Sequence, residues 1–149
     1  MPTTVLAPVA GTVVGLAAVP DPVFAEALVG PGTAIEPVRE PGVAVAPVDG
    51  TVAKLHPHAF VVVTADGRGV LVHLGIDTVK LHGEGFETLA AEGDAVAVGD
   101  PLVRWNPADV EARGLSPVCP VVALDASAEA LTGAFEGSVA VGAELFVWH

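Results

Sequence analysis

Glycine and proline interrupt this chain so often that long helices are excluded. Seventeen glycines and thirteen prolines are spread along its 149 residues, and short valine-rich runs lie between them. Proline breaks helices and glycine favours turns, so this spacing predicts many short strands joined by tight turns. The length suits one domain with a sizeable core, and we expect a single all-β domain over residues 1–149.

The valine-rich runs give the expected strands, and residue pairs that end in proline give two of the expected helix starts. Strands are expected at 4–6, 11–19, 34–38, 43–46, 50–56, 59–65, 69–74, 95–98, 101–105, 118–124, 137–141 and 145–148. Asp21 and Asn106 each precede a proline and are expected to cap short helices at 22–27 and 107–113. A third helical turn is expected at 127–131.

Two pairs of similar segments indicate that a β motif is duplicated. Ala-Pro-Val-Ala-Gly-Thr-Val at 7–13 recurs as Ala-Pro-Val-Asp-Gly-Thr-Val at 46–52, and Val-Ala-Val-Gly occurs at 96–99 and 139–142. Two copies are too few for a solenoid, so we expect one closed antiparallel β-sandwich or barrel of duplicated hybrid motif type, with a few short helical turns. The glycine of each copy is expected in a tight turn with positive φ.

The charge of the chain excludes several classes of partner. The formal net charge is −12, with six Lys and Arg, whereas nucleic acid and anionic membranes demand basic surfaces. An acidic surface fits a basic protein partner or serves solubility alone. No apolar run is long enough for direct membrane insertion, and the first residues lack a secretion-signal pattern, so we expect a cytoplasmic location. Cys119 has no second cysteine and is expected to be an inert thiol.

Two of the five histidines flank a predicted β-hairpin. Its arms, 59–65 and 69–73, are joined around Asp66-Gly67, a pair typical of a two-residue type I′ turn. In that register Phe60 pairs with His73. His58, two residues before Phe60, lies on the same face and is the diagonal neighbour of His73, about 7–8 Å away. A three-residue loop without a bulge would place the histidines on opposite faces. The face shared with the histidines is predicted to carry Phe60, Val62 and Leu71.

Two converging imidazoles are suited to phosphoryl transfer. A neutral imidazole nitrogen is a nucleophile near pH 7, and the phosphoramidate that it forms is labile enough to pass the phosphoryl group on. A second imidazole can donate N–H bonds to the phosphoryl oxygens during transfer. This chemistry needs no cofactor, and the sequence contains no Walker phosphate-binding loop.

Several motifs around these histidines resemble one family. They are Val-His-Leu-Gly-Ile-Asp-Thr-Val at 72–79, Gly-Glu-Gly-Phe at 83–86, Pro-Asp-Pro-Val-Phe-Ala-Glu at 20–26, Ala-Pro-Val-Asp-Gly at 46–50 and His-Ala-Phe at 58–60. Together they make the chain similar, over nearly its whole length, to glucose-type enzyme IIA of the bacterial phosphotransferase system. The resemblance implies an antiparallel β-sandwich with a shallow active-site depression.

The resemblance also implies roles for individual residues. His73 would accept a phosphoryl group through Nε2 from the phosphohistidine of HPr and pass it to the IIB domain of a glucose- or N-acetylglucosamine-type permease. His58 would be the second active-site imidazole, and the carbonyl of Gly75 would orient the acceptor ring. Asp77 and Asp21 match acidic residues near the site. The apolar rim that docks partners would comprise Phe24, Leu55, Leu71 and Val79.

The sequence departs from the family pattern near the second histidine. Relatives often carry Thr two residues before it, where a hydroxyl supports the site, but this chain has His56 there, followed by Pro57. What tunes His58 is therefore left open by the sequence. Lys80 stands where relatives often have Glu, which would alter the electrostatics toward partners.

Two other classes of protein share parts of the pattern. His56, His58, His73 and Asp77 resemble the H-x-H and H-x-x-x-D zinc ligands of peptidases with a related β fold, but the two sets occur in the reverse order. Lipoyl or biotinyl carriers need a modified lysine in a Met-Lys-Met-like context, which the chain lacks. A phosphocarrier requires no metal, although His58 and His73 could hold adventitious zinc.

Overall fold

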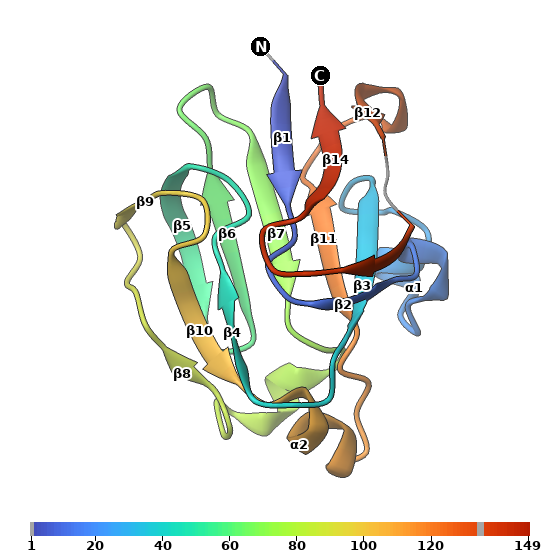
Figure 1. Ribbon diagram of the computed structural model, residues 1–149, viewed down its shortest axis with the longest axis vertical. Coiled ribbons are helices and arrows are strands. Elements are labelled where there is room, and N and C mark those ends of the chain that lie inside the picture. The colour runs from blue at the N-terminus through green and yellow to red at the C-terminus, as the bar shows by residue number, and fades with distance from the viewer. Residues whose placement is uncertain (1, 134–135) are drawn as a thin grey trace.

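The computed structural model describes residues 2–133 and 136–149 and shows an antiparallel β-sandwich (Figure 1). The strands are β1 (Thr3–Leu6), β2 (Gly11–Val13), β3 (Gly32–Pro37), β4 (Gly42–Val45), β5 (Gly50–His56), β6 (Ala59–Val63), β7 (Gly69–His73), β8 (Glu87–Thr88), β9 (Ala95–Val96), β10 (Pro101–Trp105), β11 (Cys119–Ala123), β12 (Leu131–Thr132), β13 (Gly137–Val139) and β14 (Glu144–Trp148). The helices are α1 (Pro22–Ala25), α2 (Pro107–Ala112) and the 3₁₀ turns η1 (Leu16–Ala18), η2 (Thr78–Leu81) and η3 (Ala128–Ala130).

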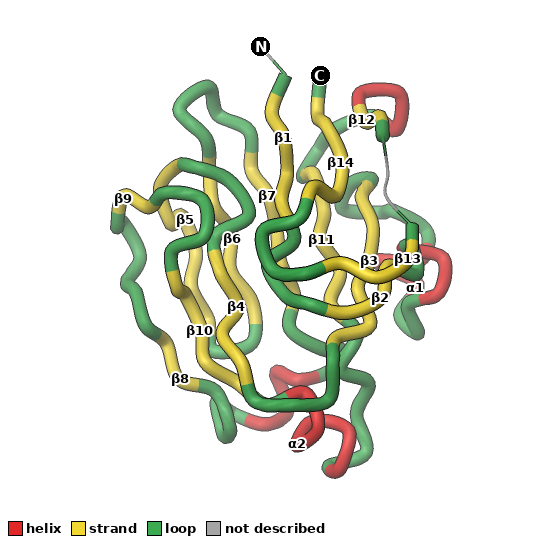
Figure 2. The backbone as a smooth tube through the Cα atoms, in the orientation of Figure 1, coloured by secondary structure: helices red, strands yellow, loops and turns green. Residues whose placement is uncertain are grey.

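The described strands form three sheets around one main core. The largest has the order β13-β2-β3-β11-β7-β6-β5-β9, and the smaller ones are β1-β14-β12 and β4-β10-β8. Phe60 of the large sheet, Leu102 of the β4-β10-β8 sheet and Phe146 of the β1-β14-β12 sheet are almost fully buried in the same cluster. The helical segments lie at the periphery of the strands (Figure 2). The expected all-β sandwich is therefore confirmed.

Equivalent backbone hydrogen bonds show that the duplication is structural. In each Ala-Pro-Val segment the proline carbonyl accepts a hydrogen bond from the residue just before the other segment. Leu6 N donates to Pro47 O and Val45 N donates to Pro8 O, each at 3.0 Å. The second pair of repeats docks on the first in the same way. Gly142 N donates to the carbonyl of residue 7 and Gly99 N donates to the carbonyl of residue 46, both at 2.9 Å. Strand pairing follows suit, because β2 pairs with β13 and β5 pairs with β9.

The glycines of the repeats serve two different purposes. Gly99 and Gly142 have φ values of +91° and +86°, as expected for turns. Gly11 and Gly50 lie in strands without positive φ, so the turn prediction is wrong for them. A Cβ at Gly11 would lie 2.1 Å from the carbonyl oxygen of Glu36, and one at Gly50 would lie 2.2 Å from a carbonyl of β6. These two positions require glycine because a neighbouring strand passes too close for a side chain.

Most expected elements are found, with shifted ends. The expected strands at 50–56 and 101–105 match β5 and β10, whereas the strand expected at 11–19 ends at Val13. Gly15, with a φ of +82°, ends the extended backbone there and is followed by η1. The caps are confirmed, because the side chains of Asp21 and Asn106 accept hydrogen bonds from the backbone N–H groups two residues later. The strands β8 and β12, of two residues each, carried no detectable sequence signal.

Within the described residues, no helix has the length and apolar character needed to cross a membrane.

Candidate functional site

Four aromatic rings form a row at the outer face of the large sheet, where β7 ends. His73 is the last residue of β7, and its ring centroid lies 5.2 Å from that of His58, with the two planes at 67°. On one side of this pair, Phe24 of α1 lies 5.3 Å from His73. On the other side, His56 stacks on His58 at 5.7 Å and 21°. The structure thus brings together the two histidines that the sequence singled out.

The predicted hairpin register is wrong by one residue. In the structure His73 pairs with Ala59, and Phe60 pairs with Val72. The loop is longer than expected because the last backbone bond before it runs from Thr64 N to Arg68 O, leaving three residues, 65–67, of which Gly67 has φ +89°. A three-residue loop that ends in a left-handed residue is a common alternative to the two-residue type I′ turn.

The corrected register changes the face on which His73 lies. His73 shares the outer face with Leu71, whereas Phe60 and Val62 point into the core with no exposed surface, so their predicted place beside the histidines is wrong. The histidines still meet, because His58 is the second residue of the tight turn between β5 and β6 and lies outside the strand alternation. Its carbonyl accepts a hydrogen bond of 2.7 Å from Leu74 N, which anchors this turn beside the end of β7.

A backbone carbonyl fixes the orientation and tautomer of His73. Its Nδ1 lies 2.5 Å from the carbonyl oxygen of Gly75, and because a carbonyl only accepts hydrogen bonds, Nδ1 carries the proton. In the neutral ring the lone pair is therefore on Nε2. Gly75 adopts a φ of +82°, and a Cβ there would lie 2.7 Å from the Thr78 side chain. The Thr78 hydroxyl donates to Leu74 O at 2.8 Å and holds this loop in place.

The environment keeps both imidazoles neutral near pH 7. Burial lowers the pKa of His73, and the Gly75 carbonyl and the carboxylates of Asp21 and Asp77 oppose that shift. Burial, followed by the nearby charges of His73 and His56, lowers the pKa of His58 from 6.5 to about 4. A neutral His73 has a free Nε2 lone pair, which makes it a competent nucleophile.

Asp21 and Asp77, the two acidic residues expected near the site, act on His73 through their negative charges. Asp21 caps α1 by accepting a bond of 2.9 Å from Val23 N. Asp77 is exposed, precedes η2 and has a left-handed backbone with φ +61°. Its carbonyl accepts a hydrogen bond from Lys80 N in η2. Both carboxylates favour the charged form of the His73 ring. They combine a local structural role with an electrostatic effect on the site.

The four residues expected to form an apolar rim differ in how exposed they are. Val79 of η2 is 58% exposed, and Leu71 is half-buried on the outer face beside His73. Phe24 is 8% exposed and packs with Leu71 in a cluster under α1. Leu55 packs against the main core instead. Phe24 therefore contributes mainly by packing against the His73 ring, since little of its own surface is exposed.

The histidine row does not assemble a metal site. Among residues 2–133 and 136–149 there is no group of three or more His, Cys, Asp or Glu side chains placed to hold a metal ion. A catalytic zinc site needs three such ligands and water. His56 and His73 belong to the strands on either side of β6, with His58 between them. Cys119 is buried, and burial raises the pKa of its thiol well above the ordinary value.

The stacking of His56 on His58 was not predicted from the sequence. His56 is exposed, and its ring also covers that of His58. A signal for this was present in the strand pairing. His56 pairs with Ala59, and Ala59 pairs with His73, so the two histidines occupy one cross-strand row on the same face. The row becomes visible only once the register of both hairpins is known.

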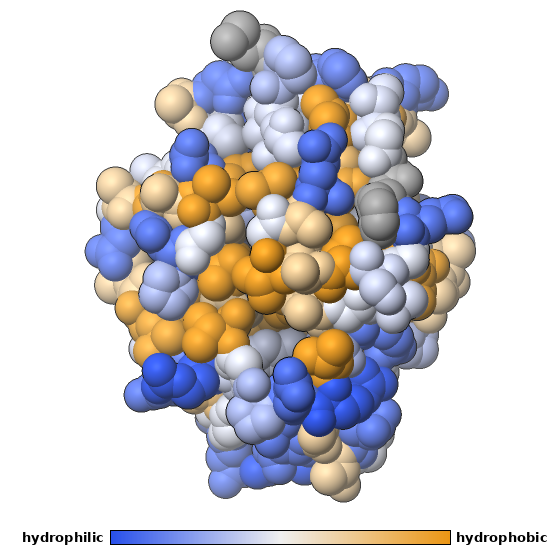
Figure 3. Space-filling model, viewed as in Figure 1, coloured by the Kyte–Doolittle hydropathy of each residue, from blue (hydrophilic) through white to orange (hydrophobic). Residues whose placement is uncertain are grey.

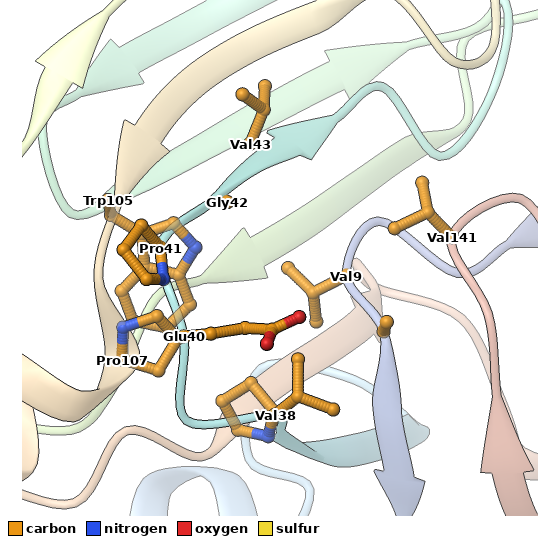
Figure 4. A pocket seen from close by; sticks show the side chains of 11 residues that line it. Val9, Val38, Glu40, Pro41, Gly42, Val43, Trp105, Pro107 and Val141 are labelled. Atoms are coloured by element: carbon orange, nitrogen blue, oxygen red, sulfur yellow. The ribbon is translucent and has the colours of Figure 1, made fainter.

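A separate apolar groove lies on another part of the surface. The face seen in Figure 3 carries an extended hydrophobic patch. Figure 4 shows a groove lined by Val9, Val38, Val43 and Trp105, with Glu40 reaching across it. None of its lining residues is a histidine, so it lacks the nucleophile that the histidine row provides.

Acid is expected to destabilise the protein through His58. Its pKa in the folded state, about 4, lies below the ordinary value of 6.5, so the unfolded chain binds more protons between these values. The free energy of unfolding should therefore fall as the pH drops from about 6.5 to about 4. Urea denaturation at several pH values should show a smaller loss for His58→Gln than for the wild type. If the free energy of unfolding fell equally with pH in both proteins, the lowered pKa of His58 would be contradicted.

Comparison with known proteins places the chain in a family. A family model described as phosphoenolpyruvate-dependent sugar phosphotransferase system, EIIA 1, matches residues 3–128. The glucose-specific EIIA component of Oceanobacillus iheyensis is 40% identical over 121 residues, which are 80% of this chain and 72% of that relative. The component from Staphylococcus aureus strain Mu50 is 42% identical over 120 residues, 79% of this chain and 71% of that relative. The structure of glucose permease IIA from Mycoplasma capricolum matches with a TM-score of 0.91 at 34% identity, covering 99% of this chain and 96% of that one. The chain therefore belongs to the EIIA 1 family of the phosphoenolpyruvate-dependent sugar phosphotransferase system.

Proposed function

We propose that this protein is a phosphocarrier whose His73 accepts a phosphoryl group from the phosphohistidine of HPr and passes it to the IIB domain of a sugar permease. Membership of the family assigns the chain to sugar phosphotransfer together with a permease. The observation that carries the finer proposal is the bond from His73 Nδ1 to the Gly75 carbonyl, because it leaves Nε2 as the nucleophile. The names of the glucose-specific relatives support a glucose permease as receiver. A cytoplasmic location fits the transfer from HPr that is proposed here.

The transfer step follows from the bonding of His73. Its Nε2 lone pair forms a bond to phosphorus while the N–P bond of the donor histidine breaks, and the donor imidazole keeps that electron pair. Because Nδ1 retains its proton, the His73 ring gains positive charge as the new bond forms. The Gly75 carbonyl and the carboxylates of Asp21 and Asp77 favour that charged ring. The reverse sequence releases the phosphoryl group to the next acceptor.

His58 is placed to stabilise the transferred group. The centroid of its ring lies 5.2 Å from that of His73, within reach of the oxygens of a phosphoryl group whose phosphorus is bound to Nε2. In the neutral state one of its nitrogens carries a proton that it can donate to those oxygens. Partners would approach over the exposed outer face, where Val79 and the half-buried Leu71 offer apolar contacts. Phe24 and the partly buried Leu55 would complete the apolar rim that docks partners.

Incubation with phosphoenolpyruvate, enzyme I and HPr tests the proposal. The protein should gain one phosphoryl group in an acid-labile, base-stable linkage, and omission of HPr should prevent this gain. Absence of labelling with active donors would overturn the proposal. Metal-dependent peptide hydrolysis in place of labelling would identify the protein as a peptidase.

A further inference from the structure

The ring of His58 is held in place by packing rather than by hydrogen bonds. Among the residues that the structure describes, none forms a hydrogen bond with this ring, whereas His73 has the Gly75 carbonyl. The backbone of His58 lies in a two-residue turn, where its neighbour Pro57 has a restricted φ. The turn fixes the position of the His58 Cα and Cβ atoms, but the orientation of the imidazole ring depends on the side chains packed against it.

Two other imidazoles flank that ring. His56 is the last residue of β5 and pairs with Ala59, so its side chain lies on the outer face that also carries His73. Its ring is nearly parallel to that of His58, at 21° and 5.7 Å, whereas the ring of His73 meets His58 edge-on. Because β6 lies between β5 and β7, His56 and His73 approach His58 from different strands.

We propose that His56 is a positioning residue for phosphoryl transfer, which stacks on His58 and keeps its imidazole directed at the phosphoryl site on His73. The proposal rests on the phosphocarrier function. A group that stabilises a transferring phosphoryl must be held in place before the reaction, because a ring free to rotate into solvent loses that advantage. Stacking supplies here the restraint that a hydrogen bond supplies for His73. It also answers the question, left open by the sequence, of what supports His58 in this chain.

The test compares two substitutions of His56 and a control. His56→Ala removes the stacking ring, His56→Phe keeps a flat ring of similar size, and His82→Asn removes an exposed histidine from a left-handed position that Asn tolerates. The rate of transfer from phosphorylated protein to a IIB domain should fall about three- to tenfold in His56→Ala, from the usual strength of ring stacking. It should stay near the wild-type rate in His56→Phe and His82→Asn.

The same substitution in a His58→Gln background shows whether His56 acts through His58. There His56→Ala should cause no further loss, because the ring that it positions is gone. An equal loss in both backgrounds would overturn the proposal and identify His56 as an independent partner contact. A wild-type rate in His56→Ala would also overturn it.

NMR of the unphosphorylated protein gives a readout that does not depend on the proposed function. The contact between the ring protons of His58 and His73 should weaken in His56→Ala and persist in His56→Phe, and the pKa of His58 should rise in His56→Ala. An unchanged ring contact would overturn the positioning role. If the wild type accepts no phosphoryl group, the phosphocarrier function fails, and the ring contact still decides whether His56 orients His58.

Discussion

A His73→Gln variant is expected to accept no detectable phosphoryl group from phosphorylated HPr. Glutamine has a similar size and keeps a polar amide, but its amide nitrogen has no available lone pair for attack on phosphorus. The loss should therefore be complete while the fold is kept. Phosphorylation is followed by mass spectrometry under conditions that label the wild type fully.

The control for this variant is His82→Asn, which changes an exposed histidine outside the row of rings and should be labelled like the wild type. Thermal unfolding of both variants checks that they fold. Labelling of a folded His73→Gln protein would show that another residue is the acceptor, and the proposed role of His73 would then be wrong.

A His58→Gln variant is expected to be labelled to completion but to pass the phosphoryl group on slowly. The nucleophile is set by the bond between His73 and Gly75, which His58 does not touch, so the end point of labelling should be preserved. Onward transfer should slow by about 10²-fold, the usual effect of removing one group that stabilises charge in the transition state. Single-turnover transfer from the phosphorylated variant to a IIB domain measures this rate.

The two rates separate the roles of the histidines. If His58→Gln transferred the phosphoryl group at the wild-type rate, His58 would be a bystander in the row of rings. If the variant failed to be labelled even at long times, His58 would be needed to form the phosphorylated state, and the assignment of a stabilising role alone would be wrong.

The sequence was most informative where chemistry and local conformation coincide. Asp21 and Asn106 predicted helix starts, because a side chain that caps a helix acts within a few residues. The duplicated segments predicted a closed β-sandwich, and their equivalent hydrogen bonds confirm it. The motif around His73 predicted the family, which the comparisons confirm.

The sequence was misleading where one residue changes a register. Asp66-Gly67 is typical of a two-residue turn, but the hairpin closes one residue earlier, at Thr64, and this shift moves Phe60 from the predicted site face to the core. His58 still lies beside His73, because it belongs to the turn between β5 and β6 and its position does not depend on the strand register. Local preference could not decide between these loops, because burial of Phe60 and Val62 in a core built from distant strands fixes the register.

The support of the site was also beyond sequence reasoning. Residues 56 and 73 are neighbours in a cross-strand row only because two consecutive hairpins align them. The sequence showed that His56 departs from the common family pattern, but not that its ring would stack on His58. Likewise, Gly11 and Gly50 were read as turn residues, although the close approach of another strand requires them.

Nε2 of His73 is the proposed phosphoryl acceptor, and nitrogen-resolved NMR tests this assignment most directly. Protein with ¹⁵N-labelled histidine is phosphorylated through enzyme I and HPr, and phosphorus–nitrogen couplings then identify the modified atom. Because the Gly75 carbonyl holds the proton on Nδ1, the predicted result is a single phosphoryl group on Nε2 of His73. A phosphoryl group on Nδ1 of His73, or on any other residue, would contradict it.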